Sequence, residues 1–304
     1  MHVILGAGGT LATELTNVLT AAGQSVRLVS HRPVAVEPPF VTWQHGDLLR
    51  SDQTLAATQG ASVVYLCAGI KYDAGVWQEQ WPVIMRNVIA ATEAAGARLI
   101  FFDNIYAYGL VNGPITGDTP YRPNSVRGEV RARIADELLE ATAGGRLHAS
   151  IARAPDFYGI HGDNSFLDSM VINKLKQGDR ALWIGDPNCL HNFIYVPDAA
   201  RATYTLAQHP ESDGHIWHLP TPAPIAGRKM LRLVAEVLNV TERSLTISKT
   251  TLRLIGLFDP VVRNSVEMYY QYDHDYRFDS TKFERAFGVQ PTPYREALGE
   301  NSRR

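Results

Sequence analysis

Cysteine and long apolar runs are scarce in this chain, and each scarcity excludes a class of protein. The 304 residues include two cysteines, Cys67 and Cys189, too few for the disulfide framework of a small secreted domain. No apolar run reaches the roughly 18 residues of a membrane-spanning helix. The first apolar run, from His2, leads directly into a glycine turn, which is not the pattern of a cleavable signal. We therefore expect a cytoplasmic protein without a membrane partner.

Concentrated positive charge and metal-ligand spacing are also absent. The formal net charge is -2 and the sequence has no basic tract, which argues against nucleic acid as a partner. Neither the 10 histidines nor the 2 cysteines have the spacing of a metal site, so we predict none. With 45% hydrophobic and 20% charged residues, the composition is that of a globular protein. The expected partner is a small-molecule substrate.

The informative segment that is present lies at the N-terminus. An apolar run from His2 is followed by Gly6-Ala-Gly-Gly-Thr-Leu-Ala12 and then by a helical pattern, which predicts a strand, a glycine turn and a helix. Gly6 allows a tight turn, Gly9 lets backbone amides approach a pyrophosphate, and the small Ala12 lets the helix pack on a sheet. The spacing predicts a dinucleotide site that includes Gly6, Gly9, Thr10, Leu11 and Ala12.

Strands and helices alternate through the first half of the chain. Strands are predicted at 25–30, 40–44, 62–67, 98–103 and 147–152, with helices at 81–95 and 127–143 among the connections. This alternation predicts an α/β fold, a Rossmann-type doubly wound parallel sheet with a smaller C-terminal substrate lobe. After Arg153 glycine and proline become frequent. We assign residues 1–155, with about 190–210, to the dinucleotide-binding domain, and 156–189 and 211–304 to the substrate lobe.

The end of the second predicted strand bears on the choice of cofactor. An enzyme that prefers NAD usually has a carboxylate there to hold the ribose hydroxyls, whereas a ribose phosphate requires cationic or hydroxyl donors. The chain has Ser30-His31-Arg32 at this point. The residues therefore favour NADP(H) over NAD(H), although Arg32 could also end a strand in solvent without a ligand.

Several ordered motifs give the chain its resemblance to a known group of enzymes. They are Gly6 to Ala12, Gly46-Asp47-Leu48, Leu66-Cys-Ala68-Gly69, Tyr108-Gly109, Arg153 to Gly159 and Phe193 to Arg201. In this order they resemble the extended short-chain dehydrogenase/reductase superfamily, the NAD-dependent epimerase/dehydratase group. The resemblance implies that Asp47 and Leu48 meet the adenine and that Ala68 and Gly69 belong to the cofactor site. It is also compatible with a homodimer formed through the helices at 81–95 and 127–143.

The positions of the catalytic residues depart from that group. The resemblance implies a serine or threonine four residues before Tyr108, where the chain has Asn104, and then a Tyr-x-x-x-Lys pair. Family spacing places Arg127 and Arg131 at the pair, and a register two residues later gives Glu129 and Arg133. Arginine stays protonated at neutral pH, so it can bind an anion or polarise a carbonyl but transfers protons poorly. Asn104 can orient a carbonyl without ionising.

The origin of the proton therefore stays open among three explanations. A nearby tyrosine could supply it, with Tyr106 as the first choice and Tyr108, Tyr121 and Tyr158 as the others. Alternatively, the substrate or solvent supplies it, or the fold has kept the dinucleotide and lost catalysis. Arg127 and Arg131 could also lie, beside Glu129 and Glu137, on a solvated, salt-bridged helix face.

Three further residues are expected at the substrate. Asp156 takes the place of a substrate-contacting asparagine of many relatives, Tyr158 follows it, and His191 stands where nucleotide-sugar enzymes carry an arginine. Apolar and aromatic residues between Leu252 and Tyr270 suggest a fairly apolar metabolite. We predict an NAD(P)-dependent oxidoreductase with a non-standard active site, acting on a carbonyl-like or imine-like centre. The alternatives are an epimerase or dehydratase with internal hydride transfer, and a catalytically silent NADP-sensing regulator.

Overall fold

The centre of the molecule is a seven-stranded sheet whose neighbouring strands are all parallel. The computed structural model describes residues 1–36, 39–159 and 165–303, without the side chains of residues 260, 261 and 303. The strand order is β12-β7-β5-β4-β1-β2-β3. These strands are β1 (His2–Leu5), β2 (Val26–Ser30), β3 (Val41–His45), β4 (Val63–Leu66), β5 (Arg98–Asp103), β7 (His148–Arg153) and β12 (Ile216–His218). The predicted α/β class is confirmed.

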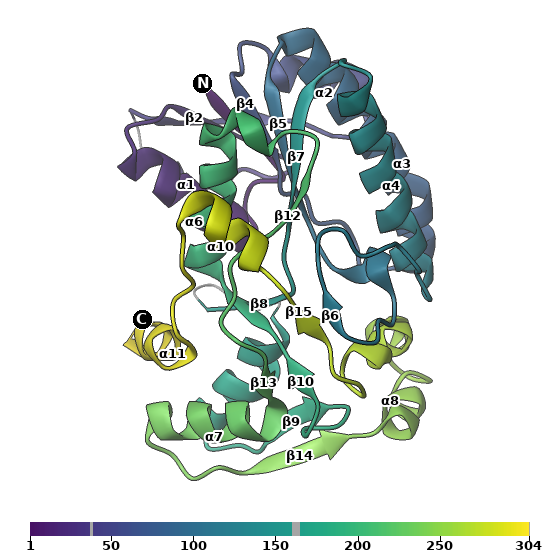
Figure 1. The fold of residues 1–304 in the computed structure, drawn as a ribbon, viewed down its shortest axis with the longest axis vertical. Helices are drawn as coiled ribbons and strands as arrows, with labels where there is room; N and C mark the ends of the chain where they lie inside the picture. The colour runs from purple at the N-terminus through teal and green to yellow at the C-terminus, as the bar shows by residue number, and fades with distance from the viewer. Residues whose placement is uncertain (37–38, 160–164, 304) are drawn as a thin grey trace.

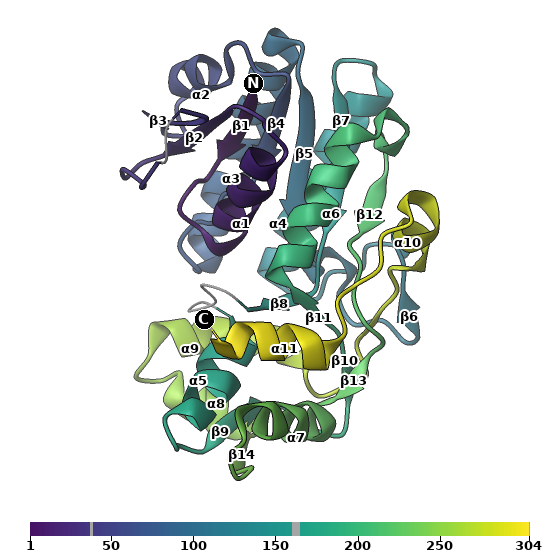
Figure 2. The same ribbon diagram turned by 90° about the vertical axis from the view of Figure 1, so that its left-hand side faces the viewer.

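Helices cover both faces of this sheet (Figure 1; Figure 2). On one face α1 (Thr10–Ala21) packs beside α6 (Val196–Gln208). On the other face α3 (Ala74–Ala95) packs between α2 (Ser51–Thr58) and α4 (Val126–Ala143). Each face has its own apolar core, because side chains alternate between the two faces along a strand: Leu5 faces the α3 side and Ile4 the α1 side.

Two helices begin earlier than the sequence indicates. The helix predicted at 81–95 starts at Ala74, where the Asp73 carboxylate caps it by accepting the Val76 N–H at 3.1 Å. Pro82 therefore lies inside α3, although proline is more typical of a first helical turn. The sequence predicts that Asp198 caps a helix beginning at Ala199, whereas α6 starts at Val196 and Asp198 lies in its first turn. Instead the Asp198 carboxylate accepts the Thr292 N–H at 2.7 Å.

The sheet has a topological switch point beside β1. Strand β1 pairs with β2 on one side and with β4 on the other, so the chain winds away from β1 in two opposite directions. The connections that leave the carboxyl ends of β1 and β4 consequently separate, and a crevice forms between them, which is where α/β folds bind ligands.

The smaller lobe lies below the carboxyl ends of the strands in both ribbon views (Figure 1; Figure 2). Its core is formed largely by Trp183, Leu175 and Val234 with their neighbours. The contributing elements are η2 (Leu167–Ile172), α5 (Asn173–Lys176), β9 (Ala181–Ile184), α7 (Gly227–Leu238) and α11 (Tyr294–Arg303). A largely exposed strand, β14 (Ser244–Ile247), lies outside this core. Strands β9 and β14 pair in parallel.

Short elements join the lobe to the sheet. Strand β8 (Asp156–Tyr158) pairs with β11 (Phe193–Tyr195), β10 (Leu190–His191) with β13 (Ile225–Ala226), and β15 (Arg277–Phe278) with β6 (Pro114–Ile115). Helices α8 (Lys249–Ile255) and α9 (Pro260–Ser265) precede a 3-10 segment, η4 (Val266–Gln271).

Two elements of the range 211–304, β12 and α10 (Thr281–Phe287), lie with the sheet. Strand β12 pairs with β7, and Phe283 of α10 is in the apolar core on the α1 side. The two parts are therefore interleaved further than the sequence-based division.

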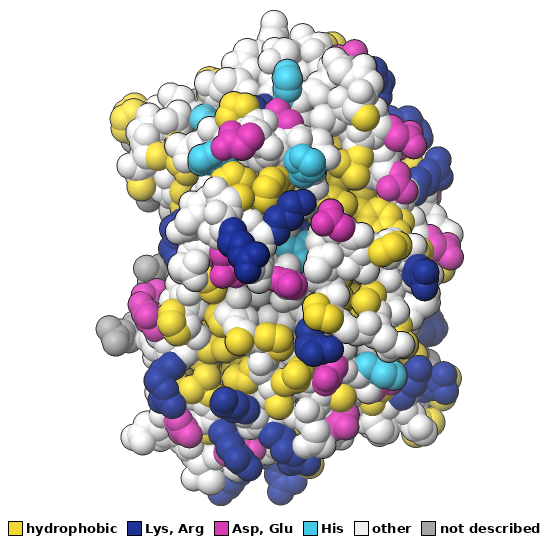
Figure 3. Space-filling model, in the orientation of Figure 1, with side chains coloured by type: hydrophobic (Ala, Val, Ile, Leu, Met, Phe, Trp, Pro, Cys, Tyr) yellow, Lys and Arg dark blue, Asp and Glu magenta, His cyan; other side chains and the backbone are white. Residues whose placement is uncertain are grey.

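Charge on the surface is mixed. Figure 3 shows Lys and Arg side chains gathered at the lower end of one face, over α7 and β14, with both signs interspersed elsewhere. Among the described residues, no helix combines the length and apolarity that crossing a membrane requires.

Candidate active site

A cavity of about 1240 Å³ follows the carboxyl edge of the sheet. One end is formed by the turns after β1, β2, β3 and β4, and the other by β8, the start of η2 and the segment 265–272. Residues from both ends of the chain therefore line one space. The predicted site residues that line it are Gly6, Gly9, Ser30, His31, Arg32, Asp47, Leu48, Ala68, Gly69, Asn104, Tyr106, Arg131 and Asp156.

At the first end, backbone approaches the cavity closely. Gly6 has φ +94°, and a Cβ there would lie 2.3 Å from the Ala68 Cα, so only glycine allows the turns after β1 and β4 to meet. Gly9 is the N-cap residue of α1 and makes no side-chain cap, and a Cβ on Gly9 would meet nothing within 4 Å. The amides at the start of α1 thus face open space with the positive end of the helix dipole behind them. These features fit a pyrophosphate.

Three residues of the predicted cofactor set, Thr10, Leu11 and Ala12, do not line the cavity. Ala12 is buried in the core between α1 and the sheet, and Leu11 packs against the same core. The side chains of Leu11 and Ala12 serve packing because this turn of α1 already lies over the sheet.

At the end of β2, the three predicted residues differ in whether their side chains are available to contact a ligand. The Ser30 hydroxyl donates to the Arg32 carbonyl at 2.6 Å and accepts from Trp43 Nε1 at 3.0 Å. His31 lies at the rim with its Nε2 3.7 Å from Asp47 Oδ1. Asp47 Oδ1 also accepts the Leu49 N–H at 2.9 Å. The exposed guanidinium of Arg32 is therefore the cation best able to reach a ligand at this end.

A buried cluster of charges lies where β5 and β7 end. The Asp103 carboxylate accepts from Arg153 Nη2 at 2.6 Å and is 3.3 Å from Arg131 Nη1. Arg131 also stacks over the rings of Trp81 and Trp77, at 4.0 and 4.7 Å. Arg131 thus reaches the cavity as a cation whose charge is shared with Asp103.

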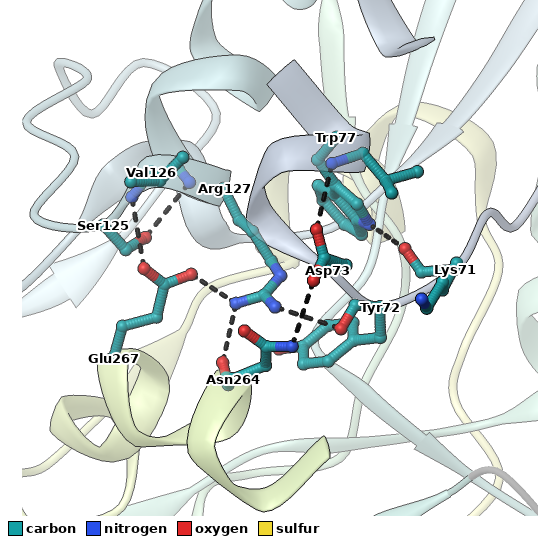
Figure 4. A network of polar contacts seen from close by, with 11 residues as sticks. Lys71, Tyr72, Asp73, Trp77, Ser125, Val126, Arg127, Asn264 and Glu267 are labelled. Carbon is teal, nitrogen blue, oxygen red and sulfur yellow. Dashed lines mark hydrogen bonds and ion pairs between the residues drawn. The ribbon is translucent and has the colours of Figure 1, made fainter. Parts of the chain in front are cut away.

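Arg127, in contrast, lies outside the cavity lining. Its fully buried guanidinium donates to the Asn264 carbonyl at 2.7 Å, to the Tyr72 carbonyl at 3.3 Å and to the Glu267 carboxylate (Figure 4). Glu267 also accepts the Val126 N–H at 3.3 Å. The residue at the expected tyrosine position therefore joins α4, the start of α3 and the segment around α9 and η4.

Helix α4 does not present these arginines to solvent. Arg127 and Arg131 are buried, whereas Glu129 and Arg133, the residues of the alternative register, are exposed. The alternative of a solvated, salt-bridged face is therefore wrong for Arg127 and Arg131, because their partners are Glu267 and Asp103 from other segments.

Tyr106 and Asn104 lie together after β5. Asn104 Oδ1 accepts the Tyr106 N–H at 3.0 Å, which leaves the amide NH₂ of Asn104 for other partners. Tyr106 begins a short 3-10 turn, η1 (Tyr106–Tyr108), and its ring stacks on Trp77 with centroids 6.2 Å apart. Burial, and then the neighbouring Tyr72, raise the pKa of Tyr106 well above its ordinary value. Its phenol therefore stays protonated at neutral pH.

The other candidate tyrosines lie elsewhere. The Tyr108 hydroxyl is 2.7 Å from His218 Nε2, and the Tyr121 hydroxyl accepts from Arg153 at 2.9 Å. Tyr158 is buried in the core of the smaller lobe beside Tyr195. Of the four tyrosines considered as proton donors, Tyr106 lines the cavity and the others do not.

Asp156 forms a polar cluster at the far end of the cavity. Its Oδ2 accepts from the Tyr272 hydroxyl at 2.5 Å and lies 3.2 Å from His191 Nε2. The His191 ring stacks on Tyr272 with centroids 5.3 Å apart and does not line the cavity. Burial, and then Asp156, raise the pKa of Tyr272 well above its ordinary value. Asp156 and Tyr272 thus face the cavity, and His191 contacts both from outside the lining.

Sequence reasoning did not select several residues that line the cavity, among them Tyr72, Trp77 and Tyr272. Nor did it select Asp103, although a carboxylate at the end of a predicted strand stands where α/β folds place ligands. Tyr272 carries no local signal, because its partner Asp156 is 116 residues away in the sequence. Of the apolar residues expected near the substrate, Leu252, Met268 and Tyr269 line the cavity. Leu257 and Phe258 are exposed instead, at 69% and 91%.

Comparison with known proteins identifies the family. Residues 2–219 match the NAD dependent epimerase/dehydratase family. The chain belongs to this family. A search of curated protein sequences finds no match to the chain. The family membership that the motifs predicted is confirmed.

Solved structures share the fold of this epimerase/dehydratase family member over its whole length. DesIV, a dTDP-glucose 4,6-dehydratase from Streptomyces venezuelae, in a double-mutant form with NAD and DAU bound, is 17% identical with a TM-score of 0.81 and covers 100% of this chain and 96% of its own. RMD from Pseudomonas aeruginosa, complexed with NADPH, is 18% identical with a TM-score of 0.73, covering 100% and 99%. WbmH from Bordetella bronchiseptica, in complex with NAD+, is 16% identical with a TM-score of 0.75, covering 98% and 95%.

Membership of this family identifies the kind of enzyme. The protein is an NAD(P)-dependent enzyme of the extended short-chain dehydrogenase/reductase type, and the family's cofactor is a nicotinamide dinucleotide.

Proposed function

We propose that the protein is an oxidoreductase that prefers NADPH and reduces a carbonyl-like or imine-like centre of a small, largely apolar metabolite. The observation that carries the proposal is the single cavity that joins the start of α1 to Asn104, Tyr106, Arg131 and Asp156. The nicotinamide supplies hydride when it is bound. The residues at the other end of the cavity then have to bind, orient and protonate the substrate.

The proposed preference for NADPH rests on the rim residues at the end of β2. Arg32 is exposed beside the cavity, whereas the nearest carboxylate, Asp47, is engaged with His31 and with the Leu49 amide. A guanidinium binds a ribose phosphate through charge-assisted hydrogen bonds. Arg32→Asp should therefore lower the ratio of NADPH to NADH affinity by about tenfold or more. An unchanged ratio, measured by calorimetry on both cofactors, would contradict the preference.

The residues in the cavity suit a reduction. The free NH₂ group of Asn104 can donate to a substrate oxygen or nitrogen. The phenol of Tyr106 lines the cavity and is protonated at neutral pH because its pKa is raised, so it carries a proton that a developing alkoxide could take up. Arg131 supplies positive charge from a fixed position, because Asp103 and Trp81 hold its guanidinium.

The deciding experiment is calorimetry of the purified protein with NADPH, followed by a panel of small ketones and cyclic imines in which NADPH absorbance is recorded. Binding together with net NADPH consumption supports the proposal. Turnover without net consumption would favour an epimerase or dehydratase with internal hydride transfer. Binding without any turnover would favour a silent NADP-sensing protein. Sedimentation of the same material tests the homodimer, which stays a prediction.

A further inference from the structure

The substrate end of the cavity combines aromatic rings with one carboxylate. Rings of Tyr72, Tyr106, Phe166, Tyr269 and Tyr272 line this end, and those of Phe166 and Tyr272 are 5.1 Å apart between centroids. Ring faces carry partial negative charge and attract cations. Asp156 adds a full negative charge within the same wall.

Asp156 keeps one oxygen free for a ligand. Tyr272 and His191 both contact Oδ2, and no residue within 1–36, 39–159 or 165–303 makes a hydrogen bond to Oδ1. The side chain is 21% exposed and lines the cavity. The two contacts hold the carboxylate in one orientation, and Oδ1 is left to accept a hydrogen bond from the substrate.

Each end of the cavity has one basic and one acidic side chain in its lining. Among the described lining residues, the ionised side chains are Arg32 and Asp47 near the end of β2, and Arg131 and Asp156 toward the other end. Asp103, 3.3 Å from Arg131, offsets the charge of Arg131 only in part, because the same carboxylate also pairs with Arg153. Beside Asp156, the carboxylate and the neighbouring ring faces would stabilise a cationic group of the substrate.

Resting on the proposed function, we propose that the substrate centre is an iminium ion, a protonated imine whose N–H is accepted by Asp156 Oδ1 and whose positive charge lies among the aromatic rings. The electrons and atoms balance without a protein proton. The iminium carbon takes up hydride from the reduced nicotinamide, forming a C–H bond, and the C=N π electrons become the nitrogen lone pair. The product is an amine, and the nicotinamide is oxidised.

This chemistry accounts for the unusual residues at the positions of the tyrosine and lysine pair. Reduction of a ketone requires a proton at the developing alkoxide, whereas an iminium ion already carries its proton on nitrogen. A site for iminium ions needs no proton shuttle at residues 127 and 131. Arg127 is consequently free to hold the segment around α9 and η4 in place, through Asn264 and Glu267.

A matched pair of ligands tests the charge preference by binding alone. Tetrahydroisoquinoline, protonated near neutral pH, and isochroman, its neutral oxygen analogue, are titrated by calorimetry into the NADPH-loaded protein, which can reduce neither. The amine should bind at least about tenfold more tightly. Equal or tighter binding of isochroman, or no binding of the amine, would overturn the inference while leaving the proposed function intact. Absence of NADPH binding would instead remove the proposed function, and the inference with it.

Two variants test whether Asp156 is the residue that gives the preference for the amine. Asp156→Asn keeps the shape of the side chain and should weaken amine binding by about tenfold or more, with NADPH and isochroman affinities unchanged. Asp179→Asn, which makes the same change of net charge at an exposed site outside the cavity lining, should change none of them. An equal effect of both variants would contradict the assignment. Should Asp156→Asn fail to fold, the ligand pair in the unmodified protein still decides.

Kinetics supply an independent readout. With NADPH, protonated 3,4-dihydroisoquinoline should be reduced in preference to its ketone counterpart, 1-tetralone. Tyr106→Phe should lower reduction of the ketone by about a hundredfold or more and reduction of the imine by far less, so that the ratio of imine to ketone turnover rises. A comparable loss on both substrates would show that the imine also depends on the phenol, contrary to the inference.

Discussion

The two ends of the cavity are constructed by different means. At the dinucleotide end, the turn from Gly6 to Gly9 and the first turn of α1 are consecutive in sequence and present mainly backbone amides. At the substrate end, Asp156 meets Tyr272 from 116 residues away, and Arg127 meets Glu267 from 140 residues away. The first end depends on backbone geometry and the second on side chains brought together by the fold.

The dinucleotide end can be recognised from the sequence, whereas the substrate end cannot. A backbone turn that leaves no room for a Cβ has a sequence signature, because glycine is the residue that satisfies it. A pair such as Arg127 and Glu267 has no fixed spacing, so the same contact can be made from many positions. Substitutions at the two ends should therefore have different effects on stability and on NADPH affinity.

The largest expected effect is at the dinucleotide end, in Gly6→Ala. The new Cβ would lie 2.3 Å from the Ala68 Cα on a backbone with φ +94°, and neither backbone segment can move far. We expect destabilisation of about 4–6 kcal/mol, combining backbone strain with overpacking, measured by denaturant unfolding.

Gly9→Ala is the matched control for Gly6→Ala. A Cβ at Gly9 meets nothing within 4 Å, so its stability should change by less than about 1 kcal/mol, while NADPH affinity falls because the methyl group enters the space before the helix amides. Full NADPH affinity in Gly9→Ala would show that the cofactor does not approach this turn.

The next effect concerns a long-range contact outside the cavity lining, made by His218 of β12 with Tyr108 and Asp279. His218 Nδ1 donates to the Asp279 carbonyl at 3.0 Å, and its Nε2 accepts from the Tyr108 hydroxyl, so the ring is neutral in the folded protein. Burial, and then Arg153, lower the pKa of His218 to about 3 from its ordinary 6.5. The unfolded chain takes up this proton below pH 6.5 and the folded chain does not.

His218 therefore contributes full stability above pH 6.5 and loses it as the pH falls toward 3. Between pH 7 and pH 4 the loss should be on the order of 3 kcal/mol. Urea unfolding at both pH values should give a smaller decline for His218→Gln, whose amide can keep both hydrogen bonds but does not titrate. If the free energy of unfolding fell equally in the two proteins, protonation of His218 would not be the cause of the loss of stability in acid.

The smallest of the three effects is expected from Arg127→Met at the substrate end. The change removes the contacts with Asn264 and Tyr72 and leaves Glu267 unpaired, but the Glu267 side chain is 26% exposed and can be hydrated. Destabilisation should be about 2–3 kcal/mol. Because the dinucleotide end is built independently, NADPH affinity should stay within about threefold.

Arg133→Met, on the exposed side of the same helix, is the control for Arg127→Met and should change stability by less than about 0.5 kcal/mol. If Arg127→Met weakened NADPH binding as strongly as Gly9→Ala, the two ends of the cavity would not be structurally independent.

Most of the sheet and the dinucleotide end were predictable from sequence. Alternating apolar segments gave the strands β1, β2, β4, β5 and β7 nearly to the residue, because a parallel sheet covered on both faces has continuous apolar strands. The start of α3 was misjudged by seven residues, Ala74 against the expected Trp81. Pro82 is tolerated there within a helix that the cap at Asp73 begins earlier.

At the substrate end, residue identities were partly anticipated but their roles were not. Asn104, Tyr106, Arg131 and Asp156 line the cavity as expected, whereas Arg127, Tyr158 and His191 lie outside its lining. Arg127 and Arg131 are one helical turn apart, so spacing alone places both on the same side of α4. Which of them reaches the cavity depends on the segment 264–267, which packs over Arg127 and leaves Arg131 against Asp103.

The sequence by itself determined the α/β fold, the glycine turn after β1 and the family, because these depend on short-range rules of backbone conformation and apolar patterning. Only the tertiary structure decided that Arg127 holds the lobe in place and that Asp156 faces an aromatic wall. Those outcomes depend on which distant side chains share a buried space, and burial determines whether a charge must be paired within the protein or left for a ligand.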